Sequence, residues 1–170
     1  MNIVIVEDNE IHLKSARKQQ PLFEAAGHTL IIIDNLPEAF EFLTKKTASY
    51  DMGLFDLYLP RGDWNGQMHK LQSSPFKQSS PFKVEDPEQL DAGSVFALIC
   101  LQQGKKAAIV TDSTRHNNWK CTMLDYLSTY SGVDDKQVMY CDMRFYHVTN
   151  QDDIRVKDWF TVFEKLTGAK

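Results

Sequence analysis

Acidic side chains end two apolar runs of this chain. Glu7 and Asp8 follow the run at residues 2–6, and Asp56 follows the run at 52–55. A parallel sheet has its ligand crevice at the carboxyl ends of its strands, so these three carboxylates are expected at one edge. Carboxylates that share a site repel one another unless a cation lies between them, and oxygen ligands favour a hard ion such as Mg²⁺. The sequence therefore predicts a Mg²⁺ site at strand ends.

Apolar runs alternate along the chain with stretches of helical periodicity, which together predict parallel strands joined by helices. The expected strands are Asn2 to Val6, Thr29 to Ile33, Asp51 to Asp56, Ala107 to Thr111 and Gln137 to Cys141. The expected helices are Glu10 to about Ala26, one opened by Pro37, Gly93 to Gln103, Asn118 to Tyr130, and Ile154 to Leu166. Pro21 predicts a kink or a division in the first helix. Five strands and five helices in alternation imply a doubly wound α/β sheet with right-handed crossovers.

Composition narrows the class of protein. At 170 residues the chain fits one domain, which we expect to span 1–170. A net charge of −4 and the lack of a basic stripe argue against nucleic acid as the main ligand. Three cysteines without a CxxC pair favour neither a disulfide framework nor a zinc site. No run approaches the roughly 18 apolar residues that span a bilayer, so we expect no membrane association and a cytoplasmic location.

The predicted regularity is interrupted by an irregular insertion at residues 57–92. It contains the hexapeptide QSSPFK twice in tandem, at 72–77 and 78–83. A Ser/Pro-rich composition does not readily form its own core, and a connection of this length is unusual. Two interpretations remain open: a surface insertion produced by duplication, or a docking or lid segment over the acidic site with Phe76 and Phe82 as exposed anchors.

These features resemble the receiver domain of bacterial response regulators. The resemblance rests on Ile3-Val4-Ile5-Val6-Glu7-Asp8-Asn9 at the first strand, Asp56-Leu57-Tyr58-Leu59-Pro60 at the third, and Thr111 at the end of the fourth. It covers most of the chain outside the insertion and the segment after the fifth strand. The resemblance implies a flavodoxin-like, five-stranded parallel sheet of order 2-1-3-4-5, flanked by five helices and carrying a long insertion after strand 3.

The resemblance also implies roles for individual residues. Asp56 resembles the phosphoacceptor, a nucleophile that receives a phosphoryl group from a histidine kinase or a small phosphodonor. Asp8 and Asp56 resemble direct Mg²⁺ ligands, with Glu7 acting through water and the backbone carbonyl of Tyr58 as a further ligand. Thr111 resembles the switch hydroxyl that hydrogen-bonds the phosphoryl group.

One element of the receiver pattern does not match. Receivers place a lysine at the end of the fifth strand, where this chain has Asp142. Lys136 stands at the opposite end of that strand, about 17 Å away, which is too far to substitute. Arg115, His116 and Arg144 are the candidates to replace the lysine. For the polar segment at 111–116 the alternative is a loop whose side chains hydrogen-bond their own backbone. We therefore predict an atypical receiver without the usual lysine.

Three functional hypotheses follow. The first is a stand-alone receiver, because only residues 167–170 remain after the last predicted helix. Its expected partners are a histidine kinase or phosphotransfer protein and a regulated downstream protein, with a second copy of the chain as a further candidate. No enzymatic activity beyond phosphorylation and dephosphorylation of Asp56 is expected. The second hypothesis is a phosphorylation-independent pseudo-receiver that binds proteins. The third, a metal-dependent phosphohydrolase, would usually carry a second acid where Tyr58 stands.

Overall fold

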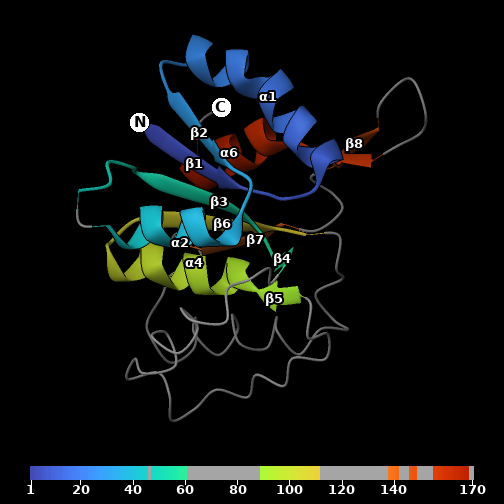
Figure 1. Ribbon diagram of the computed structural model, residues 1–170. Helices are drawn as coiled ribbons and strands as arrows, with labels where there is room; N and C mark the ends of the chain where they lie inside the picture. The colour runs from blue at the N-terminus through green and yellow to red at the C-terminus, as the bar shows by residue number, and fades with distance from the viewer. Residues whose placement is uncertain (46, 61–88, 112–137, 142–145, 149–154, 169–170) are drawn as a thin grey trace.

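A computed structural model describes residues 1–45, 47–60, 89–111, 138–141, 146–148 and 155–168. Figure 1 shows the described elements in chain order. The strands are β1 (Asn2–Val6), β2 (Thr29–Ile33), β3 (Met52–Asp56), β4 (Tyr58–Pro60), β5 (Gln89–Asp91), β6 (Lys106–Val110), β7 (Val138–Cys141), β8 (Tyr146–Val148) and β9 (Arg155–Lys157). The helices are α1 (Glu10–Ala25), α2 (Leu36–Thr44), α4 (Ala92–Gln102) and α6 (Trp159–Thr167).

Five of these strands form one parallel sheet in the order β2-β1-β3-β6-β7. Counted along the chain, these strands have the predicted order 2-1-3-4-5, so the flavodoxin-like fold class is confirmed. The order reverses between β1 and β3, and in open α/β sheets ligands bind outside the carboxyl ends of the strands at such a point. Strand β1, which Glu7 and Asp8 follow, and strand β3, which ends in Asp56, are therefore neighbours.

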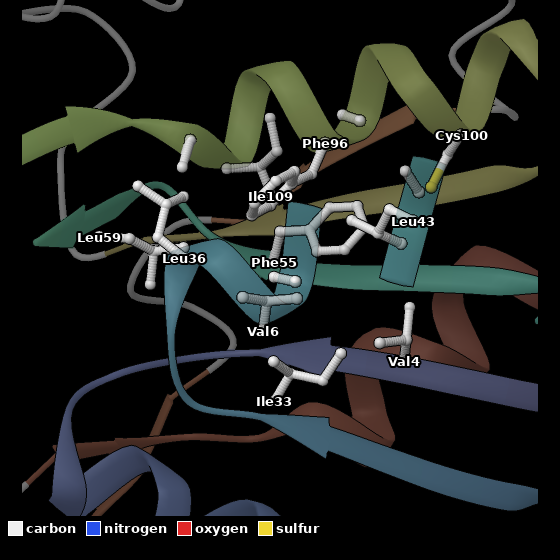
Figure 2. Close-up of a cluster of buried hydrophobic side chains, with 14 of the residues drawn as sticks. Val4, Val6, Ile33, Leu36, Leu43, Phe55, Leu59, Phe96, Cys100 and Ile109 are labelled. Atoms are coloured by element: carbon white, nitrogen blue, oxygen red, sulfur yellow. The ribbon is translucent and has the colours of Figure 1, made fainter. Parts of the chain in front are cut away.

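Two apolar layers cover the sheet, and alternate side chains of β1 enter them. Val4 and Val6 belong to a core shared with α2 and α4, whereas Ile3 and Ile5 belong to a core shared with α1 and α6. Figure 1 shows these two helix pairs on opposite faces of the sheet. Figure 2 shows the first core, in which Phe55 lies near Phe96. Burial on both faces explains why the strands are apolar throughout.

Local signals set the bounds of α1. The Asn9 side chain accepts a hydrogen bond from the Ile11 backbone N–H at 2.9 Å, which caps the first turn. Gly27 follows the helix with a φ of +77°, a conformation that favours glycine. The helix continues through Pro21, so the division that Pro21 suggested does not occur.

The last part of the chain differs from the prediction. A helix was expected from Ile154, but α6 begins at Trp159, and Arg155–Lys157 form β9, which pairs antiparallel with β8. The Asp158 side chain accepts from the Thr161 backbone N–H at 3.1 Å and so caps α6 after the strand. Ile154 and the predicted helix Asn118 to Tyr130 lie outside the described residues.

The insertion after β3 begins and ends in regular structure. β4 and β5 form a two-stranded antiparallel sheet in which Tyr58 pairs with Asp91 and Pro60 with Gln89. The tandem repeat at 72–83, including Phe76 and Phe82, lies outside the described residues. Among the helices that the structure describes, none has the length and apolar character needed to cross a membrane.

Candidate functional site

Three carboxylates meet at the carboxyl edge of the sheet. Glu7, Asp8 and Asp56 each offer an oxygen within 4.8 Å of the others. The register explains this, because Val6 of β1 lies opposite Phe55 of β3, so the residues that follow reach the same edge together. The sequence therefore identified the residues that the fold brings together.

The carboxylates differ in their surroundings. Glu7 is fully buried, whereas 15% of the Asp56 side chain is exposed. Burial raises the pKa of Glu7 to about 7, against the opposing effect of the Lys157 ammonium and with a smaller contribution from Asp56. Burial, followed by the negative charge of Asp56, also raises the pKa of Asp8. Burial and mutual repulsion thus disfavour the ionised forms of these carboxyl groups.

Lys157 supplies the basic partner of these acids. Its ammonium donates to Glu7 Oε2 at 2.6 Å and forms an ion pair with Asp56 Oδ1. Only 2% of the Lys157 side chain is exposed, so this pair of contacts accounts for a charge that is otherwise costly to bury. The ammonium therefore bridges the proposed nucleophile and its buried neighbour.

Lys157 was not among the residues expected to supply a cation to the site. A basic residue was expected near the end of the fifth strand, but Lys157 stands 16 residues after Cys141, in β9. The absence of a lysine from the end of the fifth strand stays as predicted, but the acidic edge has a basic partner from β9, which pairs antiparallel with β8. The residues considered as replacements or as neighbours of the site lie outside the described ranges: Arg115, His116, Lys136, Asp142 and Arg144.

Thr111 lies at the same edge as Asp56. Asp56 pairs with Val110 in the parallel ladder between β3 and β6, and Thr111 is the next residue. The Thr111 side chain is buried, with 1% exposure. A buried hydroxyl one strand away from the carboxylate fits the predicted switch position. The backbone of Tyr58 belongs to β4, and the role predicted for its carbonyl stays a prediction.

Gly93 fixes the chain immediately after Asp56. A Cβ at Gly93 would stand 2.2 Å from the Asp56 backbone oxygen and 2.9 Å from Leu57 Cα. The Gly93 N–H donates to the Leu57 carbonyl at 3.1 Å, so the start of α4 touches the segment that follows β3. Both neighbouring atoms are backbone, so only glycine permits this approach.

Comparison with known proteins supports the fold. No family model matches the chain, and no curated protein does. Among solved structures, the chain is similar to a response regulator receiver domain protein (CheY-like) from Methanospirillum hungatei JF-1, with a TM-score of 0.51. The chain has a receiver-like fold. Sequence identity is 17%, and the match covers 99% of this chain and 94% of the other. At this identity the likeness concerns the fold, and the roles of residues rest on the geometry above.

Proposed function

We propose that this protein is a response-regulator receiver that accepts a phosphoryl group on Asp56 and regulates a partner protein through the resulting change in conformation. The observation that carries the proposal is the Lys157 ammonium, which contacts both Glu7 and Asp56 at the carboxyl edge of a receiver-like fold. A cation at this position can pair with the oxygens of a phosphoryl group on Asp56. Phosphoryl transfer depends mainly on such positioning and charge compensation.

The same residues are suited to a divalent cation. Three carboxylates face one ammonium, which leaves an excess of negative charge if all are ionised. Both oxygens of Glu7 are already engaged, Oε1 by the Asn9 backbone N–H at 3.0 Å and Oε2 by Lys157. We therefore assign direct contacts to Asp8 and Asp56 and a water-mediated one to Glu7.

Oxygen ligands alone favour Mg²⁺ over zinc or copper. The backbone carbonyl of Tyr58 is the further ligand in this proposal. A bound Mg²⁺ would supply charge neutralisation for the transferring phosphoryl group. The proposal assigns no other chemistry to the ion.

The residues of the chain act in a simple sequence. A carboxylate oxygen of Asp56 forms a bond to phosphorus as the bond between phosphorus and the donor breaks, and the donor leaves with that electron pair. The donor is a phosphohistidine of a kinase or phosphotransfer protein, or a small acyl phosphate. The Lys157 ammonium then pairs with a phosphoryl oxygen, and the Thr111 hydroxyl donates to another. Movement of Thr111 is the proposed start of the signal to a downstream partner.

The pseudo-receiver alternative drew its main support from the apparent lack of a lysine. Lys157 removes that support, so we favour a receiver that is phosphorylated. A phosphohydrolase would usually carry an acid two residues after Asp56, and Tyr58 stands there. No observation on the described residues favours either alternative.

Incubation with Mg²⁺ and acetyl phosphate tests the proposal directly. Intact mass spectrometry should show the addition of one phosphoryl group, which is lost in Asp56→Asn and in the presence of EDTA. Beryllofluoride with Mg²⁺ should shift the backbone amide resonance of Thr111 in the unsubstituted protein only. An unchanged mass together with an unshifted Thr111 resonance would sink the proposal, whereas steady phosphate release from a general substrate would revive the phosphohydrolase.

A further inference from the structure

Two buried polar residues of α1 hold the backbone of Lys157. The Ser15 hydroxyl donates to the Lys157 carbonyl at 2.9 Å, and Gln19 Nε2 donates to the same carbonyl at 3.1 Å. Gln19 Nε2 also donates to Ser15 Oγ at 2.9 Å, while Gln19 Oε1 accepts from the Phe160 backbone N–H at 2.9 Å. We call Ser15 and Gln19 the α1 clamp. The clamp joins helix α1 to the junction between β9 and α6.

The clamp lies where apolar residues would be expected. Ser15 and Gln19 are buried on the same side of α1 as Ala16 and Phe23, which belong to a hydrophobic core. Burying polar groups there is costly unless they are hydrogen-bonded. Both N–H groups of the Gln19 amide and its oxygen have partners, and the Phe160 N–H, which can only donate, fixes the orientation of the amide. Hydrogen bonds to Lys157 and Phe160, about 140 residues away in the sequence, therefore explain why polar residues are buried here.

The central sheet does not fix Lys157 through its hydrogen-bond ladder. β9 pairs with β8 in a separate two-stranded sheet, whereas Asp56 belongs to the five-stranded sheet. Among the described residues, Ser15 and Gln19 of α1 donate hydrogen bonds to the Lys157 carbonyl. A further hydrogen bond joins α6 to α1, because Trp159 Nε1 donates to the His12 carbonyl at 3.3 Å. Helix α1 thus sets the position of β9 relative to the acidic edge.

The start of the same helix also holds the acidic partner of Lys157. The backbone N–H of Asn9, the N-cap of α1, donates to Glu7 Oε1 at 3.0 Å, and the Lys157 ammonium takes Glu7 Oε2. We propose that Ser15 and Gln19 are positioning residues, which place the Lys157 ammonium between Glu7 and Asp56. The purpose of that placement, pairing with a phosphoryl group, rests on the proposed function. The placement itself does not.

A double-mutant cycle on unfolding tests the placement without any ligand. Gln19→Met removes the amide at similar length, and Lys157→Met removes the ammonium but keeps the carbonyl that the clamp binds. In urea with EDTA, Gln19→Met should lower the folding equilibrium constant about fivefold more when Lys157 is present than in the Lys157→Met background. A purely structural clamp would give equal losses in both backgrounds, and that result would overturn the proposal.

Further variants keep the cycle decisive. If Lys157→Met does not fold, Asp56→Asn replaces it as the background, because it removes one charged partner of the ammonium. A coupling in this background supports the placement, and additivity overturns it. Gln20→Met is the matched control, because Gln20 is only partly buried and its amide donates to Glu24 on the same helix at 2.8 Å. It should show no coupling. Ser15→Ala, which removes the hydroxyl bonded to the Lys157 carbonyl, should behave like Gln19→Met. Ser15→Thr keeps the hydroxyl and should behave like the unsubstituted protein.

Phosphorylation provides the functional arm. With Mg²⁺ and acetyl phosphate, Gln19→Met should slow phosphoryl uptake about tenfold when Lys157 is present. In the Lys157→Met protein, Gln19→Met should not lower the rate of uptake further. If the unsubstituted protein takes up no phosphoryl group, the proposed function fails, and the unfolding cycle still decides the placement. If uptake occurs but the two substitutions act additively on its rate, the clamp does not act through Lys157.

Discussion

The two ends of strands β3 and β6 bury polar groups in different ways. At the carboxyl end, Asp56 lies in a cluster of charged side chains that includes Glu7 and Lys157. At the amino end, the Tyr50 hydroxyl donates to Gln103 Oε1 at 2.9 Å beside the buried thiol of Cys100. Neutral hydrogen-bonded pairs are cheap to bury, whereas charges are costly unless they are paired. Among the residues that the structure describes, the closely packed group of buried opposite charges lies at the carboxyl end, where we place function.

The largest expected effect is the loss of the buried ammonium. Lys157→Met leaves Glu7 and Asp56 without their cation, and the free energy of unfolding should fall by about 3 kcal/mol in EDTA at neutral pH. Lys106→Met is the control at the amino end, where the Lys106 ammonium donates to the Leu166 carbonyl at 3.0 Å and should contribute about 1 kcal/mol. Urea unfolding measures both. Equal losses would remove the contrast between the two ends.

The second comparison concerns two glycines. Gly93→Ala places a methyl group 2.2 Å from the Asp56 carbonyl oxygen, so the backbone must shift, at a cost of about 2 kcal/mol. Gly104 lies at the amino end with a φ of +70° and open space around its Cβ position. Gly104→Ala should therefore cost only about 1 kcal/mol, from backbone conformation alone. In addition, phosphoryl uptake should fall in Gly93→Ala and stay unchanged in Gly104→Ala, as acetyl phosphate assays would show.

The smallest effect is a pH dependence at the amino end. Burial raises the pKa of the Cys100 thiol to about 12, against opposing effects of the Tyr50 hydroxyl and the Lys105 charge, from a reference value of 9.0. A raised pKa in the folded state means that the thiol's contribution is complete below pH 9 and is lost as the pH rises toward 12. At pH 10 the loss should be about 1 kcal/mol. Under reducing conditions, Cys100→Ala should flatten the fall in unfolding free energy between pH 8 and 10, and an unchanged slope would contradict the assignment.

The fold could be predicted because its signals are local. The apolar runs at 2–6, 29–33 and 52–55 each carry strand character within a few residues, and the acids at the carboxyl ends of β1 and β3 mark the edge of the sheet. A parallel sheet then brings Glu7, Asp8 and Asp56 together without further information. The acidic half of the site could therefore be predicted from strand ends alone.

The basic part of the site, Lys157, could not be predicted, because its position depends on contacts between distant parts of the chain. Arg155–Lys157 form a strand of only three residues just before α6. Because the helix has strong apolar periodicity, this strand was predicted as part of the first turn of the helix. Asp158 held a usable signal. An aspartate three residues before Thr161 is typical of an N-cap, and it would have placed the helix start at Trp159 and left Lys157 in a separate extended segment.

The pairing of β4 with β5 has a consequence for the length of this protein. Because Pro60 lies opposite Gln89, the two residues that flank positions 61–88 of the sequence are neighbours on hydrogen-bonded strands. For any flexible connection between two such fixed points, the entropy of closure grows only with the logarithm of length, so halving the length changes it by only about 0.6 kcal/mol. Insertions and deletions between Pro60 and Gln89 can therefore accumulate while the spacing of Asp56 and Gly93 in space is preserved.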